Sequence, residues 1–89
     1  MRAIITVVGE DKVGIIAGIS SVLAEANVNI LDISQTTLQE YFTMMMMVDI
    51  SELEISMEKL KHQLKEKGEE LGVSVKLQHE DIFRSMHRI

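Results

Sequence analysis

The sequence predicts an α+β domain in which strands and helices follow in the order β-α-β-β-α-β. Three observations lead to this prediction. A short β-rich run at Ile4–Val8 is apolar on both faces, as in a central strand. Two later segments repeat apolar residues at helical spacing. Between these segments, Phe42–Ile50 places apolar side chains on one face of an extended chain.

The first helix is predicted from the apolar repeat that follows a loop at residues 9–14. Gly9 ends the first strand, and Gly14 stands just before the repeat. Asn27 is the expected C-cap, because asparagine tolerates the left-handed backbone conformation found at helix ends. The repeat consists of Ile15, Ile16, Ile19, Val22, Leu23 and Ala26.

A pair of strands joined by a tight turn is predicted next. Residues 29–38 mix isoleucine with threonine and other polar side chains, which favours an edge strand. Gln39-Glu40 is long enough only for a hairpin turn. In the third strand, residues 42–50, the predicted faces are Phe42, Met44, Met46, Val48 and Ile50 on one side, and Thr43, Met45, Met47 and Asp49 on the other.

The second helix has two candidate starts. Ser51 begins a capping-box pattern that ends at Glu54, and Ser56 is the alternative N-cap. We prefer Ser56, because the apolar stripe then consists of Met57, Leu60, Leu64 and Leu71, with Gly68 completing the row. A half-exposed fourth strand follows with Val73, Val75 and Leu77 on one face. The chain ends in an amphipathic tail that carries Ile82, Phe83, Met86 and Ile89 on one side.

Right-handed crossovers place both helices on one face of an antiparallel sheet with strand order 4-1-3-2. The predicted architecture is therefore a ferredoxin-like βαββαβ sandwich with a short C-terminal amphipathic helix. Residues 1–89 form one domain, including the tail at 80–89, because a chain of this length is too short for two domains. The other face of the predicted sheet has no helix over it, although Met45 and Met47 point to that face.

The composition excludes several classes of function. The chain has no cysteine, which excludes disulfides, zinc-thiolate sites and a thiol nucleophile. Its formal net charge is −5, which argues against binding a nucleic-acid backbone. It shows no secretion signal, and no apolar stretch approaches the roughly 20 residues of a membrane-spanning helix. We therefore expect a cytoplasmic protein with neither nucleic acid nor membrane as a partner.

The sequence shows no convincing arrangement of catalytic residues, and the fold alone selects no function. An RNA-binding domain of this architecture needs stacking aromatic residues, which make up only 3% of this chain. An acylphosphatase-like enzyme needs an arginine in the first loop to hold phosphate, and residues 9–14 contain none. His62 and His87 are expected to be solvated. We predict no enzyme activity, no catalytic residue, no metal site and no cofactor.

The loop between the first strand and the first helix offers a different chemistry. Gly14 allows a tight turn, and the N–H groups of Ile15, Ile16 and Ala17 then lie at the positive end of the helix dipole. Such a helix N-terminus binds a carboxylate. Asp11 is placed to accept from an ammonium group, and the Asn29 side chain both donates and accepts hydrogen bonds. An amino acid would satisfy this set.

These residues resemble the ACT domain, a small regulatory module that senses amino acids in many metabolic enzymes. The resemblance covers nearly the whole chain and is most specific at residues 11–16 and 27–30. The sequence is most similar to stand-alone single-ACT proteins of bacteria and archaea. It is also similar to the ACT halves of the glycine cleavage system transcriptional repressor family.

The resemblance implies that an effector binds at a subunit interface of a homodimer. It implies contacts from the loop of Asp11, from the Gly14 turn with Ile15 and Ile16, and from Asn29. One residue departs from the pattern: a ligand-contacting histidine of some members falls at Gly9 here. That departure speaks against serine specificity of the kind those members show.

Two functional hypotheses follow. In the first, the chain is a regulatory module that binds an amino acid or similar small metabolite as a homodimer and signals allosterically through a partner protein. In the second, it is a protein–protein interaction or assembly domain that has lost the ligand. Glu10 and Asp11 bear on this choice, because they repel a carboxylate unless the helix N-terminus outweighs them. Two covers are predicted for the helix-free face of the sheet: the tail at 80–89, across its own sheet or a partner's, and the same face of a second subunit. Pairing of the edge strand at residues 29–38 with its symmetry mate is a third route to the dimer.

Overall fold

The computed structural model describes residues 1–10 and 13–86, apart from the side chains of Phe83 and Met86. Asp11 and Lys12 of the predicted loop, and His87 to Ile89 of the predicted tail, lie outside the described residues. The elements in chain order are β1 (Arg2–Glu10), α1 (Ile15–Glu25), β2 (Asn29–Leu38), β3 (Tyr41–Asp49), α2 (Met57–Leu71), β4 (Val73–His79) and α3 (Glu80–Met86).

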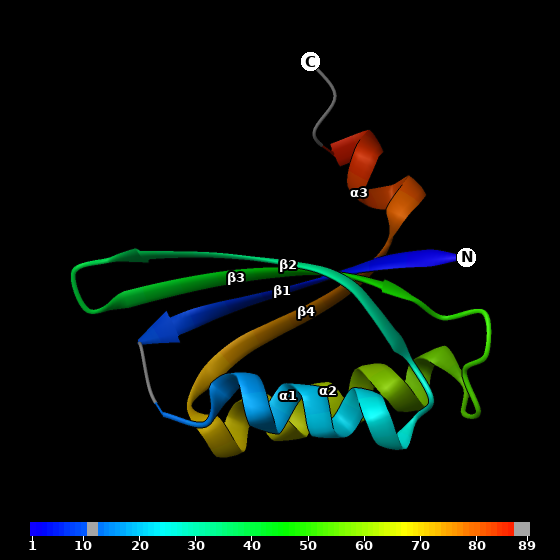
Figure 1. Cartoon of the computed structure of the whole chain (residues 1–89), viewed down its shortest axis with the longest axis horizontal. Helices are drawn as coiled ribbons and strands as arrows, with labels where there is room; N and C mark the ends of the chain where they lie inside the picture. The colour runs from blue at the N-terminus through cyan, green and yellow to red at the C-terminus, as the bar shows by residue number, and fades with distance from the viewer. Residues whose placement is uncertain (11–12, 87–89) are drawn as a thin grey trace.

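The four strands form an antiparallel sheet in the order β2-β3-β1-β4, which is the predicted order read from the other edge. Figure 1 shows α1 and α2 side by side on one face of this sheet, with α3 on the opposite side. The predicted ferredoxin-like fold is confirmed. β2 and β4 are the two edges of this sheet, and β3 is the strand with which β2 pairs.

The boundaries differ from prediction mainly in the outer residues of the strands. β1 is predicted at residues 4–8, but it extends to Arg2 and Glu10, because its backbone pairs with β3 over that whole length and with β4 over all but the two end residues. β4 likewise continues to His79, which pairs with Ala3. β2 has the predicted bounds, with a register irregularity between Ile30 and Asp32.

The helix ends follow local chemistry. Ser56 is the N-cap of α2, as predicted, and its Oγ accepts a hydrogen bond from the Lys59 N–H at 3.1 Å. α1 ends with Ala26 as its C-cap, one residue before the predicted Asn27. Asn27 nevertheless has the expected left-handed backbone, with φ of 61°, and its side-chain amide donates to the Glu52 carbonyl at 3.1 Å.

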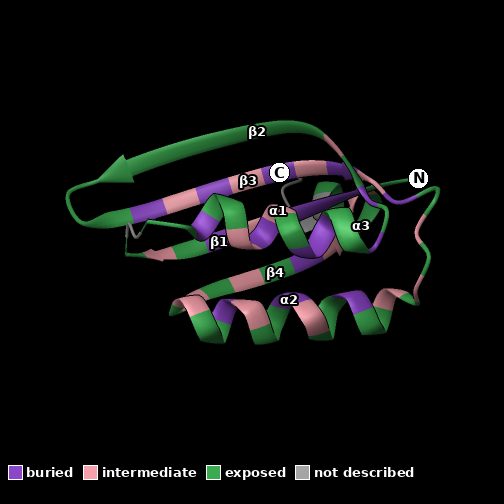
Figure 2. Ribbon diagram, turned by 60° about the horizontal axis from the view of Figure 1, so that its bottom comes forward, coloured by how far each residue is buried: buried purple, intermediate pink, exposed green. Residues whose placement is uncertain are grey.

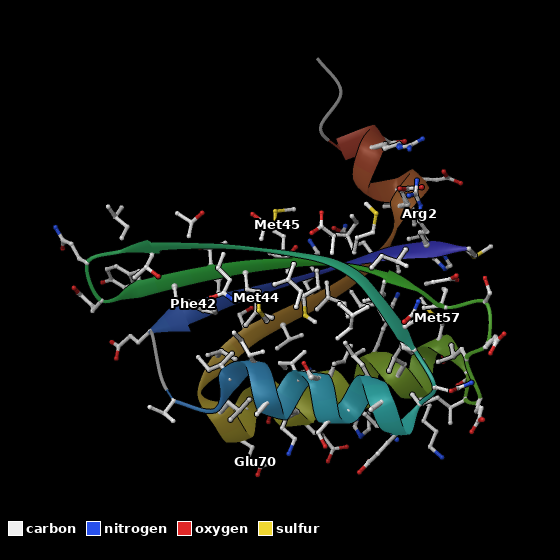
Figure 3. All side chains as sticks on the ribbon, viewed as in Figure 1. Arg2, Phe42, Met44, Met45, Met57 and Glu70 are labelled. Atoms are coloured by element: carbon white, nitrogen blue, oxygen red, sulfur yellow. The ribbon has the colours of Figure 1, made fainter. Side chains whose placement is uncertain are left out.

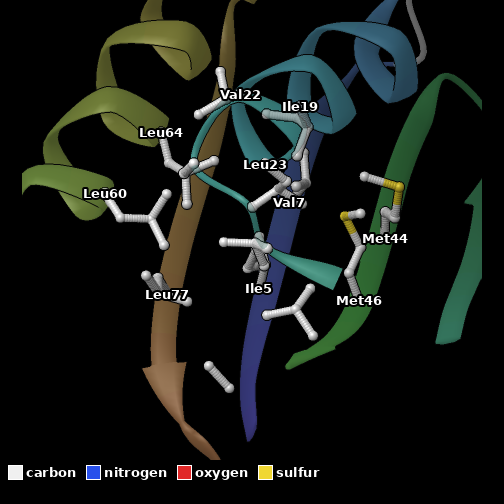
Figure 4. Packing of buried hydrophobic residues seen from close by; sticks show 14 of the residues in the cluster. Ile5, Val7, Ile19, Val22, Leu23, Met44, Met46, Leu60, Leu64 and Leu77 are labelled. Atoms are coloured by element: carbon white, nitrogen blue, oxygen red, sulfur yellow. The ribbon is translucent and has the colours of Figure 1, made fainter. Parts of the chain in front are cut away.

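The core lies between the sheet and the two long helices (Figure 4). Each inward-facing residue of β3 is buried, in the alternation that the sequence predicts. β1 and α1 supply most of the remainder. Among the described residues no polar side chain is buried. The largest fully buried side chains are Ile5, Ile15, Ile19, Leu23, Met44, Met46, Leu60, Leu64, Val7 and Val48.

Gly18 allows the two long helices to pack closely. A Cβ on Gly18 would lie 3.0 Å from Leu71 Cδ1, so the absence of a side chain brings α1 close to α2. The two helices lie side by side over the sheet.

The predicted C-terminal helix forms as α3, but it does not lie across the sheet. It stands away from the helix-free face, beside the start of β1 (Figure 1). Arg2 and Glu80 form an ion pair of 2.7 Å at its base, and Arg84 lies 3.6 Å from the same carboxylate. Ile82 is 52% exposed. Within the described part of the chain, no helix combines the length and apolar character needed to cross a membrane.

Candidate functional site

The turn before α1 has the geometry that the sequence predicts. Gly14 is the N-cap residue of α1 with φ of 93° and ψ of −2°, a left-handed conformation that glycine adopts without strain. Among the described residues, no heavy atom lies within 4 Å of a Cβ built at this position. The described part of the chain therefore leaves the helix N-terminus uncovered at Gly14.

Among the described residues, no side chain caps the N–H groups in the first turn of α1. No acidic residue lies in that turn. The Gly18 N–H donates to the Gly14 carbonyl at 2.8 Å, so the N–H groups without intrahelical partners belong to the residues between them. The Ile15 side chain is anchored in the core, whereas Ile16 is 39% exposed.

The predicted ammonium contact, Asp11, lies outside the described residues. Glu10, the exposed last residue of β1, is the described acid nearest to the turn in sequence. Gly9, which takes the place of a histidine in some ACT domains, faces Val73 of β4. A Cβ at Gly9 would lie 2.6 Å from Val73 Cγ1, so a larger side chain there requires Val73 to move.

Asn29 lies at the other end of the molecule, where it lines a hollow of about 440 Å³. This hollow is within the size range of small-molecule sites. Its wall is mostly polar and comes from the end of α1, the start of β2 and the segment after β3. The lining residues are Ala24, Asn27, Val28, Asn29, Asp49, Ser51 and Glu52.

Asp49 is the charged centre of this hollow and pairs with Asn29 across β2 and β3. Its carboxylate accepts hydrogen bonds from the Ser51 hydroxyl and, at 2.9 Å, from the Ser51 N–H. These bonds, side chain first, and the Met1 ammonium at 3.6 Å hold the pKa of Asp49 below its ordinary value, against a smaller opposing effect of burial. Asp49 is therefore ionised at neutral pH.

The sequence reasoning missed Asp49, Ser51 and Asn27 as members of this site. A signal for Asp49 was present, because it is the one acid that follows the four consecutive methionines of β3. Its neighbour Ser51 was weighed only as a helix cap, a role that Ser56 fills. These residues can be recognised as one site only when the end of β3 is known to pair with the start of β2.

The two predicted halves of the site do not meet within one chain. Gly14 precedes α1 and Asn29 follows it, and the 11 residues of that helix span about 16 Å. The register of the sheet agrees, because Glu10 pairs with Tyr41, and Tyr41 pairs with Leu38 at the far end of β2. The Gly14 turn therefore lies at the Leu38 end of the sheet, opposite Asn29.

β2 itself is unusually open for a strand of its length. Nine of its ten residues are exposed, whereas β3 beside it alternates between buried and half-buried (Figure 2). On the helix side, Ile33 of β2 is 37% exposed, because α1 and α2 lie mainly over the other strands. A long exposed edge strand is a template for pairing with another chain.

Comparison with known proteins agrees with this fold. A family model described as ACT domain matches residues 2–78. The chain belongs to the ACT domain family. ACT domains are regulatory modules that bind small molecules and are not themselves catalytic, in agreement with the prediction that this chain is no enzyme. Within the described residues, no group of three or more acidic or histidine side chains is arranged to hold a metal ion.

Similar proteins occur in bacteria and archaea. The chain is 63% identical over 89 residues to a UPF0237 protein of Clostridium acetobutylicum, covering all of both chains. It is 59% identical over 88 residues to a UPF0237 protein of Methanopyrus kandleri, covering 99% of this chain and 98% of that one. An ACT domain protein from Streptococcus pneumoniae has a solved structure with 48% identity and a TM-score of 0.80, covering 93% of each chain.

Proposed function

We propose that this ACT domain is a regulatory module that binds an α-amino acid between two copies of the chain. The observation that carries the proposal is the separation of Gly14 from Asn29 along α1, combined with the open edge of β2. Two copies that pair through β2, antiparallel around a two-fold axis, extend the sheet across the interface. Such pairing brings the Asn29 end of one strand to the Leu38 end of the other.

The Leu38 end of the sheet is also the end at which the Gly14 turn lies. Each composite site then combines the Gly14 turn of one chain with Asn29 of the partner subunit, and the two-fold axis produces two such sites. Exposed apolar residues support the same arrangement. Ile16 on α1 and Ile33 on β2 are both more than a third exposed on the helix side, where a second copy would cover them.

The charges of such a site suit a zwitterion. The uncapped N-terminus of α1 supplies N–H donors and positive potential for the ligand carboxylate. The opposite wall supplies the amide of Asn29 and the ionised carboxylate of Asp49, which suit the ligand ammonium. The ligand links the two copies, and we propose that a partner protein reads the resulting change in the dimer.

A mixing experiment tests the composite site. Gly14→Asp places a carboxylate at the N-terminus of α1, at a left-handed backbone position that strains any side chain but strains aspartate and asparagine less than most. Gly14→Asn is the uncharged control of the same shape. Each of Gly14→Asp and Asn29→Ala is expected to abolish or weaken amino-acid binding when measured alone by calorimetry.

When the two variants are mixed one to one and allowed to exchange subunits, mixed dimers contain one site with both native residues. Random exchange therefore restores about a quarter of the sites at native affinity. No recovery after demonstrated subunit exchange would contradict a site shared between chains. If none of the common amino acids binds the native protein at millimolar concentration, the ligand-free assembly domain becomes the better explanation.

A further inference from the structure

β4 forms the edge of the sheet opposite β2. It pairs with β1, and no second strand lies beside it among the described residues. An edge strand directs backbone N–H and C=O groups away from its neighbour, where another chain can pair with them. Figure 2 shows β4 and α2 along one border of the molecule and β2 along the other. β4 is therefore a second place at which a strand can be added to the sheet.

Two lysines of α2 lie on the flank of the helix that faces β4. Gly68 marks this flank, because a Cβ built there would lie 2.8 Å from Val75 Cγ2 of β4. Lys61, Lys65 and Gly68 follow one another at intervals of four and three residues, so they form one row along the helix. Another side of α2 packs against Gly18 of α1. Lys61 and Lys65 are exposed on the side of α2 nearest the open edge of β4.

A third lysine lies on the other side of the same edge. Lys76 of β4 pairs with Thr6 of β1. Its neighbours Val75 and Leu77 pack in or against the core, so Lys76 points to the helix-free side of the sheet. The residue is exposed. Lysine side chains therefore flank the β4 edge on both sides of the sheet.

None of these three lysines forms an ion pair with a described residue. Within α2, His62 Nε2 lies 2.7 Å from Glu66, and Lys67 lies 3.2 Å from Glu70. β4 contains no acidic residue. Three cations without a described carboxylate partner, along one strand edge, are complementary to an acidic ligand.

The stability of α2 does not explain its order of charges. Cations stabilise the C-terminal turn of a helix, where the dipole is negative. The last turn of α2 nevertheless contains Glu69 and Glu70 and no basic residue. Glu70 points away from the sheet (Figure 3). Lys61 and Lys65 lie before that turn, on the flank beside β4, which favours a role in binding over a role in the helix.

We propose that the β4 edge, flanked by Lys61, Lys65 and Lys76, binds an acidic extended segment of a partner protein, which joins the sheet as a fifth strand. Main-chain hydrogen bonds to β4 supply affinity in this mode of recognition. Side chains of the added strand alternate between the two sides of the sheet. Acidic residues therefore reach Lys61 and Lys65 on one side and Lys76 on the other. β4 has seven residues, which sets the length of the paired segment at about seven.

The same charges disfavour other occupants of this edge. Two β4 strands paired around a two-fold axis would bring the lysines of both copies together, which is electrostatically unfavourable. The apolar stripe of α2 packs in the core, unlike the apolar face of a helix that binds a membrane. The net charge of −5 opposes a nucleic-acid backbone.

This contact does not depend on the proposed amino-acid site, because β2 and β4 are opposite edges of the sheet. It supplies the kind of partner that a regulatory module requires. Its test is carried out without amino acid, so that failure of the amino-acid site leaves the result for β4 unchanged.

A synthetic peptide of three Thr-Glu-Glu repeats tests the charge pattern, because its glutamates point to both sides when the peptide is extended. The native protein should bind it in calorimetry at low salt. Lys65→Glu and Lys76→Glu should each weaken binding about fivefold, since each replaces an attraction by a repulsion. Lys59→Glu is the matched control on α2, two residues before Lys61 and so on another face, and should change the dissociation constant less than about twofold.

Hydrogen exchange tests whether the peptide adds as a strand. Backbone amides of β4 that point away from β1 should exchange several-fold more slowly with peptide, whereas amides of β2 should keep their rates. Binding without slower exchange in β4 would overturn the proposal, as would no binding at millimolar concentration or equal weakening by Lys59→Glu and Lys65→Glu. Protection of β4 that rises with protein concentration alone would assign the edge to a second copy. Tighter binding of an oligothymidylate of similar charge, lost in Lys65→Glu, would assign it to nucleic acid; either result contradicts the proposal.

Discussion

The N-termini of α1 and α2 occupy equivalent places in the two crossovers of the fold, yet the two helices are capped differently. α2 begins at Ser56, whose hydroxyl accepts from the Lys59 N–H, and Glu58 adds negative charge to its first turn. α1 begins at Gly14, with no acid in its first turn and no capping side chain among the described residues. Within the described part of the chain, one helix end is capped and the other is not.

We interpret this difference as one between a structural helix end and the helix end of the proposed ligand site. A capped N-terminus gains about 1 kcal/mol from its side chain, and a glycine N-cap gives up only a few tenths of that. The lack of a cap on α1 among the described residues therefore costs the fold little. A domain that needed only stability would be expected to close both ends in the same way. The open end is consistent with an anionic ligand group at α1.

The largest expected effect comes from filling the open end. An amino acid that binds there should stabilise the fold by about 2.7 kcal/mol at 100 times its dissociation constant. In a domain of this size that raises Tm by more than about ten degrees. A thermal-shift screen measures this, and Gly14→Asp should remove the shift while Ser56→Ala, at the closed end, keeps it. An equal loss of the shift in both variants would mean that the two helix ends do not differ in function.

Asn29→Ala tests the opposite wall of the same site. Losing one hydrogen bond to a charged ligand should cost about 1.5–3 kcal/mol of binding, a tenfold to hundredfold weakening. Because Asn29 is exposed at the start of an edge strand, the free energy of unfolding without ligand should change little. Calorimetric titration and urea unfolding measure the two quantities. Unchanged affinity would assign Asn29 to the turn alone.

Ser56→Ala measures the value of the closed end. Removing the hydroxyl that accepts from Lys59 should cost about 1 kcal/mol of stability, and Ser56→Gly should cost only a few tenths. Urea unfolding distinguishes the two variants. Neither should alter ligand affinity. If Ser56→Ala costs nothing, capping does not explain the contrast between the helices.

Much of this fold could be predicted from the sequence, because periodicity and local chemistry set it. Apolar residues alternate so regularly along Phe42–Ile50 that the buried face follows from position alone. Ser56 could be recognised as the N-cap of its helix from the local sequence. Strand lengths were less predictable, since Arg2 and His79 join the sheet through backbone pairing with strands distant in sequence. The pattern of apolar and polar side chains does not indicate which end residues take part in that backbone pairing.

The candidate site could be predicted only in part. Gly14 could be recognised from the sequence, because a glycine just before a helix indicates a left-handed backbone conformation. Once α1 is recognised, it follows that Gly14 and Asn29 lie at its opposite ends. In the proposed site the two residues come together only through a second chain. Asp49 escaped notice because its partners, Ser51 and Asn29, gather around it only when β2 pairs with β3.

The smallest expected effect concerns the charge opposite the open helix end. The pKa of Asp49 is lowered in the folded protein, first by the Ser51 hydroxyl. A lowered folded-state pKa adds stability that is fully present above the unfolded value, ordinarily 3.8, and is lost as the pH falls through the folded value. Native protein should therefore lose slightly more stability than Asp49→Asn between about pH 5 and pH 3. Ser51→Ala should reduce this difference without removing it, because the Ser51 N–H still donates to the carboxylate. Urea unfolding midpoints measured across this pH range test the prediction. Parallel curves for native protein and Asp49→Asn would show that folding does not stabilise the charged form of Asp49, which the proposed site places opposite the N-terminus of α1.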